Sequence, residues 1–434
     1  MLRQIAFGIG LLSAAMLPHA AWAEGARTLQ IIISKNKQSM TVYDGDMVVA
    51  TSRVSTGKSG HETPGGIFSI LEKRKYHESN IYSNAPMPFM QRLTWSGIAL
   101  HESDSVPSYP ASHGCIRMPG MFAKSLYKMT RRGVHVIVSD APVTPARIDH
   151  PALFAPRKPL PDGALVSDLE LRPSRIDDPS RPVEVAMHVM PSSPGRQAKQ
   201  TEAKEEDTAP LRILIHRRGE REILRDAQAL LTELGFDAGT PDGVAGPKTR
   251  SAIAGFKRWK ELPQKGPLLS PAFLTALYRS AGKAEPPSGQ LMVRQNFKPL
   301  FEAPIGIRQP ERALGTHFLI ADKVDRDAES AEWRTVTLAN SMAPRTMKRL
   351  GITIEANPYD PDAAAGALDR IDIPEDVRER IDALLSDGTS LTITDDGYSP
   401  ETGKGTDFIT ITQPASTPAA ADPKPVKQSG KWKG

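Results

Sequence analysis

The chain has a single cysteine, Cys115, with two histidines close to it in sequence, His101 and His113. A thiol needs a base beside it to form a thiolate near neutral pH, and histidine, with an ordinary pKa of about 6.5, fits that role. Gly114 leaves backbone space beside the sulfur, and the amides of Gly114 and Cys115 are candidates to stabilise an oxyanion. Arg117 would add positive charge suited to a substrate carboxylate. This pattern favours nucleophilic thiol catalysis.

Three other interpretations of these residues stay open from the residue types alone. A lone cysteine is most often a small buried apolar residue. Two histidines and one cysteine are zinc ligands in other settings, but a structural zinc site takes four ligands and only three lie close here, so we expect no metal. His113 and Cys115, two residues apart, would also share one side of a strand without any chemical role.

Residues 28–140 have the pattern of a strand-rich domain that would position this cluster. β-Branched, alternating segments are broken by turn residues, and one helical stretch begins at a proline and is followed by a glycine. The predicted strands are Thr28–Ser34, Met40–Tyr43, Met47–Thr56, Gly66–Leu71 and Val134–Ser139, and the predicted helix is Pro119–Arg132.

The stretch Ser112–Arg117 (SHGCIR), with His101 upstream, resembles the signature of the L,D-transpeptidases of the YkuD type. Thr63–Phe68 (TPGGIF) is similar to a turn of that family. Met87–Met90 and Leu93–Trp95 are similar to the stretch before the first histidine in Gram-negative members. The resemblance covers about residues 28–140, and its cysteine motif is highly specific.

Some residues depart from the family pattern. Glu102 stands where many members have glycine, and Arg117 stands where others have asparagine. The spacing from His101 to Ser112 is on the short side. These departures concern the substrate pocket and leave the implied chemistry intact.

The resemblance implies a mechanism in which Cys115 attacks the carbonyl of the third residue of a peptidoglycan tetrapeptide stem. His101 is the implied base, oriented by a backbone carbonyl near Glu102. Terminal D-alanine leaves, and an amine of a neighbouring stem resolves the thioester into a 3-3 cross-link, whereas water would make the enzyme a carboxypeptidase. His113 would hold the site and the substrate, and Ser112 is a structural hydrogen bonder rather than a reactant. The implied catalytic set is Cys115, His101, His113 and Gly114, the implied substrate-binding pair is Arg117 and Ser112, and no cofactor is implied.

Residues 1–23 read as a cleavable export signal. Arg3 gives a positive start, Ile5–Leu17 is an apolar run of 13 residues, and Ala21-Trp22-Ala23 is a small-x-small cleavage site. That run is short of the roughly 20 residues that span a bilayer. We therefore expect a periplasmic, wall-associated protein with no membrane span after cleavage.

Two further segments follow the first domain. Residues 141–210 hold 12 prolines and a charge run, which predicts a linker. Residues 220–281 have helical spacing, and Asp226–Leu277 resembles a three-helix peptidoglycan-binding module. Asp237 and Asp242 lack the spacing of a calcium loop, so we interpret that loop as a turn.

Residues 290–412 read as a mixed α+β unit of unknown role, followed by a basic tail at 413–434. Residues 313–320 weakly resemble 63–70, which leaves open a degenerate second copy of part of the first domain, without a cysteine. The predicted fold is therefore α+β and multidomain.

Composition limits the function classes. A length of 434 residues with 39% hydrophobic and 24% charged residues fits several globular domains and excludes a membrane bundle, a collagen and a coiled coil. A net charge of +5 is small for this length and does not call for nucleic acid. Besides cross-linking of stems, attachment or release of an envelope protein at the stem, and a non-catalytic peptidoglycan anchor, remain alternatives.

Overall fold

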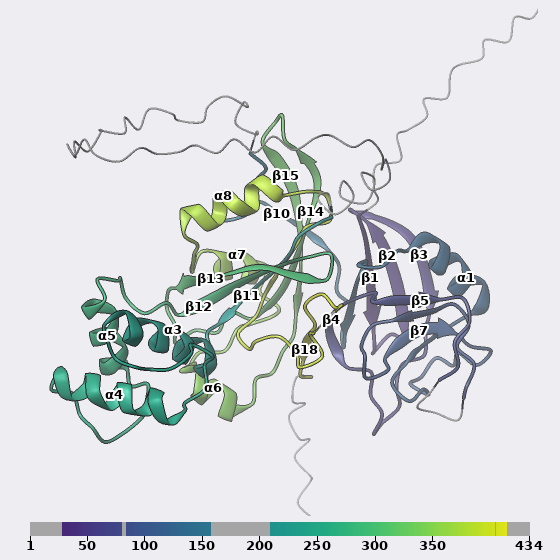
Figure 1. Cartoon of the computed structure of the whole chain (residues 1–434). Coiled ribbons are helices and arrows are strands. Elements are labelled where there is room, and N and C mark those ends of the chain that lie inside the picture. Colours follow the sequence, from purple (N-terminus) through teal and green to yellow (C-terminus); the bar gives the residue numbers. More distant parts are fainter. Residues whose placement is uncertain (1–27, 80–83, 158–208, 404, 415–434) are drawn as a thin grey trace, which may run out of the picture.

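The computed structural model describes residues 28–79, 84–157, 209–403 and 405–414 (Figure 1). The predicted export signal, most of the predicted linker and nearly all of the basic tail lie outside these residues. Three units are seen: an N-terminal unit, a helical unit, and a C-terminal sheet that lies between the two (Figure 1).

The N-terminal unit is built on a six-stranded sheet of order β18-β4-β9-β1-β2-β3. Its central strand β1 is buried along its whole length because it is covered on both faces. Ile31 and Ile33 face one apolar cluster, whereas Ile32 faces another, as the two-residue period of a strand requires. The strands are β1 (Leu29–Ser34), β2 (Ser39–Asp44), β3 (Met47–Arg53), β4 (Gly65–Ser69), β9 (His135–Ser139) and β18 (Thr410–Thr412).

A smaller four-stranded sheet covers one face of this layer together with helix α1 (Gly120–Met129). α1 ends three residues before the predicted Arg132, because Thr130 is extended and its hydroxyl bonds back to the Leu126 carbonyl. The strands of the small sheet are β5 (Glu72–Arg74), β6 (Met90–Arg92), β7 (Ala99–Glu102) and β8 (Ile116–Met118).

The C-terminal unit is an eight-stranded sheet of order β10-β15-β14-β17-β11-β12-β13-β16. Helices α7 and α8 pack on one face, where Leu368 and Ile381 join a large apolar core. The strands are β10 (Ala146–Ile148), β11 (Arg212–Arg217), β12 (Gly289–Gln295), β13 (Lys298–Ile307), β14 (Thr316–Asp325), β15 (Ser330–Leu338), β16 (Ile371–Asp372) and β17 (Ser390–Ile393), and the helices are α6 (Pro344–Leu350), α7 (Ala363–Leu368) and α8 (Glu375–Leu384).

The helical unit is an insertion between two neighbouring strands of that sheet. β11 and β12 pair antiparallel and close at Arg217 and Gly289, and the three helices lie between them in sequence. The helices share their own core, which includes Ile253, Phe256 and Phe273. They are α3 (Glu220–Glu233), α4 (Pro247–Trp259) and α5 (Pro271–Ser280), which confirms the predicted three-helix module.

The predicted linker at 141–210 is wrong at its beginning. β10 pairs antiparallel with β15, and Phe154 is buried in the C-terminal core, where its carbonyl accepts a hydrogen bond from the Trp333 indole at 3.0 Å. The sequence did not predict β10 because a three-residue edge strand among prolines shows no hydrophobic periodicity. The residues that pack against this segment are distant in sequence.

The two large sheets pack face to face, so the first and last units are joined by a buried apolar interface. Ile32 and Ile137 of one sheet contact Phe318 and Val336 of the other. Burying side chains of this size contributes roughly 1.5–3 kcal/mol each. The end of the stretch 290–412 belongs to the other unit, because β18 pairs with the edge of β4 in the N-terminal sheet.

The stretch 313–320 includes the beginning of β14. β14 and β4 each pair antiparallel with two neighbours, but their sheets differ in strand order.

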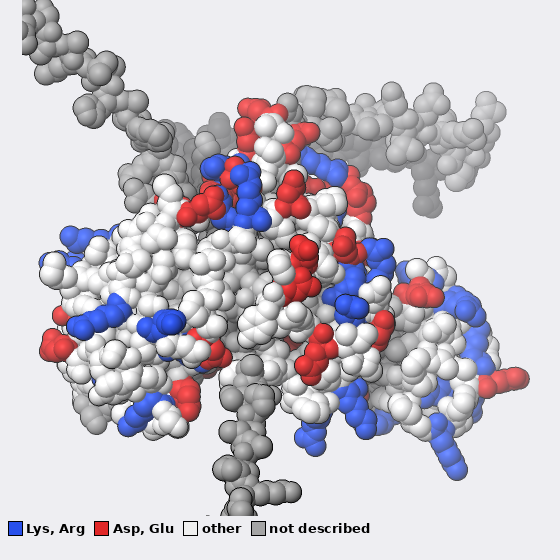
Figure 2. All heavy atoms as spheres, turned by 180° about the vertical axis from the view of Figure 1, so that it is seen from behind, with Lys and Arg blue, Asp and Glu red and all other residues white. Residues whose placement is uncertain are grey.

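On the face shown in Figure 2, basic and acidic side chains are interspersed rather than gathered into a field of one sign, in keeping with the small net charge.

Candidate active site

Adjacent parallel strands place His101 and Cys115 together. His101 lies on β7 opposite Arg117 of β8, and Cys115 immediately precedes β8. One strand across and two residues along correspond to roughly 8 Å between the Cα atoms. The Cys115 side chain packs against Ala99, which is two residues before His101 and therefore on the same face of β7.

The Cys115 thiol is partly buried and donates a hydrogen bond to the Gly97 carbonyl at 3.2 Å. Burial raises the pKa of Cys115 above its ordinary value, while the Ala99 amide and the charges of Arg92 and Arg117 act in the opposite direction. The sulfur is thus a neutral thiol at neutral pH, not a preformed thiolate.

His101 is almost completely buried and its ring is held by its own strand. Its Nδ1 lies 2.6 Å from the Glu102 carbonyl oxygen. A carbonyl only accepts, so Nδ1 carries the proton and Nε2 is left with its lone pair. Burial, aided by the Arg117 charge and opposed by the bond to Glu102, lowers the pKa of His101 to about 4. A neutral imidazole with a free acceptor nitrogen is the form suited to a general base.

Ser112 and Gly114 shape the turn that presents the sulfur. The Ser112 hydroxyl donates to the Cys115 carbonyl at 2.5 Å and accepts from the Gly114 amide at 3.1 Å. Ser112 is buried, which supports its structural interpretation, and its part in substrate binding stays a prediction. The Gly114 amide is already bonded to Ser112, so the Cys115 amide is the better candidate to stabilise an oxyanion, and that role for Gly114 stays a prediction.

Gly114 is required for its backbone conformation. Its φ is +109°, and a Cβ built there would lie 2.8 Å from Ile98 Cδ1. Its carbonyl accepts a hydrogen bond from the Thr63 hydroxyl at 2.7 Å, and that hydroxyl in turn accepts from the Gly57 amide at 2.8 Å. The TPGGIF turn thus holds the cysteine turn from the other side.

A rim of basic side chains borders this cluster. His113 is exposed, and its ring contacts that of His61 edge-on at 4.7 Å between centroids. Desolvation and the nearby charges of Lys58, His61 and Arg117 lower the pKa of His113. Within the described chain the Arg117 guanidinium has no hydrogen bond or ion pair, so its charge is available to a ligand.

The sequence motifs did not reveal His61 or the contact of the 94–98 turn with the thiol, although Leu93–Trp95 resembles a stretch of the family. Lys58 and His61 reach the site because the Lys58 amide bonds the Ser112 carbonyl at 3.0 Å, a contact between segments over 50 residues apart. Trp95, half exposed, lies on the rim with Arg92 over its ring. No spacing rule links these residues to Cys115, although the two glycines flanking residues 58–59 do mark a loop.

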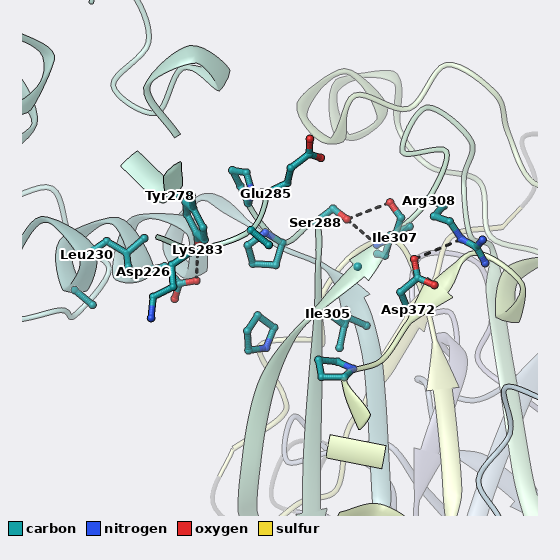
Figure 3. Close-up of a pocket in the computed structure, with 17 residues that line it drawn as sticks. Asp226, Leu230, Tyr278, Lys283, Glu285, Ser288, Ile305, Ile307, Arg308 and Asp372 are labelled. Atoms are coloured by element: carbon teal, nitrogen blue, oxygen red, sulfur yellow. Dashed lines mark hydrogen bonds and ion pairs between the residues drawn. The ribbon is translucent and has the colours of Figure 1, made fainter. Parts of the chain in front are cut away.

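A cavity of about 600 Å³ lies elsewhere, between the helical unit and the C-terminal sheet (Figure 3). Leu230 and Tyr278 line it from the helices, and Ile305, Ile307 and Asp372 line it from the strands. None of its lining residues comes from the N-terminal unit, so it is separate from the thiol cluster. Across the residues that the structure describes, no group of three or more histidine, cysteine or acidic side chains is placed to hold a metal ion.

Family comparisons agree with this geometry. Residues 29–138 match the model of the L,D-transpeptidase catalytic domain, YkuD, and residues 220–268 match that of a peptidoglycan binding domain. The chain therefore contains a YkuD-type L,D-transpeptidase catalytic domain and a peptidoglycan-binding domain. No curated protein matches the chain.

Among solved structures, the chain is similar to L,D-transpeptidases from three bacteria. The Mycobacterium smegmatis protein is 23% identical over 26% of this chain and 59% of its own, with a TM-score of 0.25. That of Xylanimonas cellulosilytica is 25% identical over 26% and 62%, with a TM-score of 0.25. A mutant Enterococcus faecium enzyme is 26% identical over 25% and 49%, with a TM-score of 0.24. The chain thus spans less than two thirds of the length of each.

Proposed function

We propose that this protein is a cysteine L,D-transpeptidase that forms 3-3 cross-links between peptidoglycan stems. The observation that carries the proposal is the placement of Cys115 beside His101, with the ring oriented by the Glu102 carbonyl, inside the segment that matches the catalytic-domain family. Peptidoglycan is the partner that the second matched domain indicates.

The reaction begins from a neutral pair. As Sγ of Cys115 forms a bond to the carbonyl carbon of the third stem residue, the thiol proton passes to Nε2 of His101. The bond to D-alanine breaks, and the proton is delivered to the departing amine. The resulting thioester is attacked by the side-chain amine of a neighbouring stem, whose proton returns through Nε2 to the sulfur.

The basic rim supports substrate binding. Stem peptides end in a carboxylate, and the charges of Arg117, near the sulfur, and of Lys58, near the rim histidine His113, suit it. His113, which is exposed on the same rim, contributes to holding the substrate rather than to proton transfer. The developing oxyanion is assigned to the Cys115 amide.

The proposed setting is the periplasm. The predicted export signal at 1–23 supports it, together with the match of the helical unit to a peptidoglycan-binding domain. In the part of the chain that the structure describes, no helix is long and apolar enough to cross a membrane.

Incubation of the purified protein with tetrapeptide muropeptides tests the proposal. We expect tripeptide–tripeptide dimers and free D-alanine by mass spectrometry, and an intact-mass adduct of a tripeptide stem on Cys115. The Cys115→Ser variant should lose both while still binding sacculi. If only tripeptide monomers form, the enzyme is a hydrolase and not a cross-linking transpeptidase. If the stem is transferred only to an added envelope protein, the enzyme attaches proteins to peptidoglycan. Absence of any adduct would leave a peptidoglycan anchor.

A further inference from the structure

The turn at residues 94–98 supports the thiol at two points. Its Gly97 carbonyl accepts the Cys115 hydrogen bond, and Ile98 occupies the space beside Gly114. Gly97 has a φ of +116°, and the Ile98 amide bonds the Thr94 hydroxyl at 3.0 Å. Any movement of this turn therefore moves the group that orients the sulfur.

A carboxylate from the other end of the chain holds this turn. Oε2 of Glu401 accepts hydrogen bonds from the amides of Trp95 at 3.2 Å and of Ser96 at 3.3 Å. Two bonds to one charged oxygen are stronger than bonds between neutral groups. Glu401 follows the last strand of the C-terminal sheet, so this contact joins the C-terminal unit directly to the active-site turn.

The segment that carries Glu401 is fixed on the C-terminal sheet. Arg294 donates to the Gly403 carbonyl at 2.9 Å, and Arg212 pairs with Asp407 at 3.3 Å. Arg212 also donates to the Gly133 carbonyl of the N-terminal unit at 2.9 Å, so a buried cation ties the two units beside this segment.

The same segment is fixed on the N-terminal unit. Ile409 is fully buried in the core under the small sheet, and β18 pairs with the edge of β4. A Cβ at Gly66 would lie only 2.1 Å from the Thr410 carbonyl oxygen, so the second glycine of the TPGGIF turn is what permits this approach. The Glu401 carboxylate is therefore presented from a backbone anchored on both sides.

We propose that Glu401 is a positioning residue for the Cys115 thiol, through which the C-terminal unit completes the active site. Its carboxylate fixes the 94–98 turn, the turn fixes the Gly97 carbonyl, and that carbonyl holds the Cys115 sulfur in place through the S–H hydrogen bond. The consequence for acyl transfer rests on the proposed function, whereas the consequence for thiol reactivity does not.

Two measurements on the full chain test this role. The first is the rate of thioester formation from a tetrapeptide stem. We expect Glu401→Ala to lower kcat by roughly 10- to 100-fold, with little change in KM, because displacements of about 1 Å cost that much. Glu401→Gln keeps an oxygen acceptor and should recover most of the rate. Glu355→Ala removes an exposed carboxylate of the same unit that has no hydrogen bond or ion pair within the described chain, and should have no effect.

The second measurement is the pH profile of alkylation by iodoacetamide, which is specific because Cys115 is the sole cysteine. In Glu401→Ala the Gly97 carbonyl no longer stabilises the neutral thiol, so the alkylation profile should move to lower pH. The profile of Glu401→Gln should stay in place. Both variants should keep the wild-type Tm. Should Glu401→Ala not fold, Glu401→Asp, too short to reach both amides, takes its place. A wild-type profile together with a wild-type kcat in the alanine or aspartate variant would overturn the proposal. A shifted profile in a protein without transferase activity would retain it and reject the proposed function instead.

Discussion

His101 and Arg117 are direct partners across the parallel strands β7 and β8. The guanidinium consequently acts on the imidazole and on the thiol, because its charge lowers the pKa of His101 and also that of Cys115. One cation thus adds to the burial that keeps the imidazole neutral and at the same time opposes the burial that raises the pKa of the thiol.

This relationship predicts the behaviour of Arg117→Gln. Removing the charge should raise the pKa of the Cys115 thiol further and move the iodoacetamide profile to higher pH. It should also raise KM for a tetrapeptide stem by roughly ten-fold if the carboxylate is bound there. Arg117→Lys keeps the charge and should retain most of the profile. An unmoved profile in Arg117→Gln would show that this cation does not act on the sulfur.

The buried state of His101 predicts an unusual pH dependence of turnover. With a pKa of about 4 in the folded protein, its imidazole is neutral at every pH above that value. We therefore expect kcat/KM for thioester formation to be flat from about pH 6 to 8 and to fall only as the pH approaches 4. An inflection well above pH 4 that disappears in His113→Ala would assign the titration to the exposed rim histidine, and one that persists would contradict the neutral pair.

His135 predicts acid sensitivity of the interface between the two large sheets. Its ring is buried against Phe318 at 4.6 Å between centroids, and burial, with the Arg212 charge, lowers its pKa well below 6.5. The unfolded chain then binds a proton that the folded chain does not. The stabilising difference is complete above pH 6.5 and is lost as the pH falls below it, by about 1.4 kcal/mol per pH unit.

Urea unfolding between pH 7 and pH 5 measures this effect. As the pH is lowered, the free energy of unfolding should decrease more steeply in the wild type than in His135→Phe. The two slopes should differ by up to the value for one bound proton, about 1.4 kcal/mol per pH unit. Other buried histidines, His216 and His317, titrate in the same direction and remain in both proteins, so only the difference counts. Equal slopes would mean that His135 is not protonated on unfolding in this range.

Local patterns in the sequence were sufficient for the cysteine motif and for five of the six strands of the large N-terminal sheet, but the short strands of the small sheet were not predicted. β1 and β9 have β-branched residues at alternate positions, and the turn Ser112–Arg117 carries its own side-chain hydrogen bonds. The three helices of the helical unit were equally accessible, since each has one apolar face.

The short strands that join the first and last units could not be predicted in this way. β10 and β18 are three residues long, and their partners are more than 180 residues away in sequence. Nothing local distinguishes such strands from loops, and their pairing is decided by tertiary packing. Glu401 was missed for this reason, because it reaches Trp95 only after β18 has paired with β4.

The insertion of the helical unit predicts that wall binding and catalysis are separable. Arg217 and Gly289 are the last Cα partners of β11 and β12, so a two-residue Asn-Gly turn in place of residues 218–288 would close the strands as a hairpin. We expect the shortened protein to fold and to form thioester from soluble tetrapeptide stems at nearly the wild-type rate, because no helical-unit residue contacts the thiol cluster. Its binding to sacculi in a pull-down should fall by roughly ten-fold or more, since the matched binding domain is gone. Retained sacculus binding would place the wall contact on another surface, and a lost thioester rate in a folded variant would show that the helical unit supports the distant site.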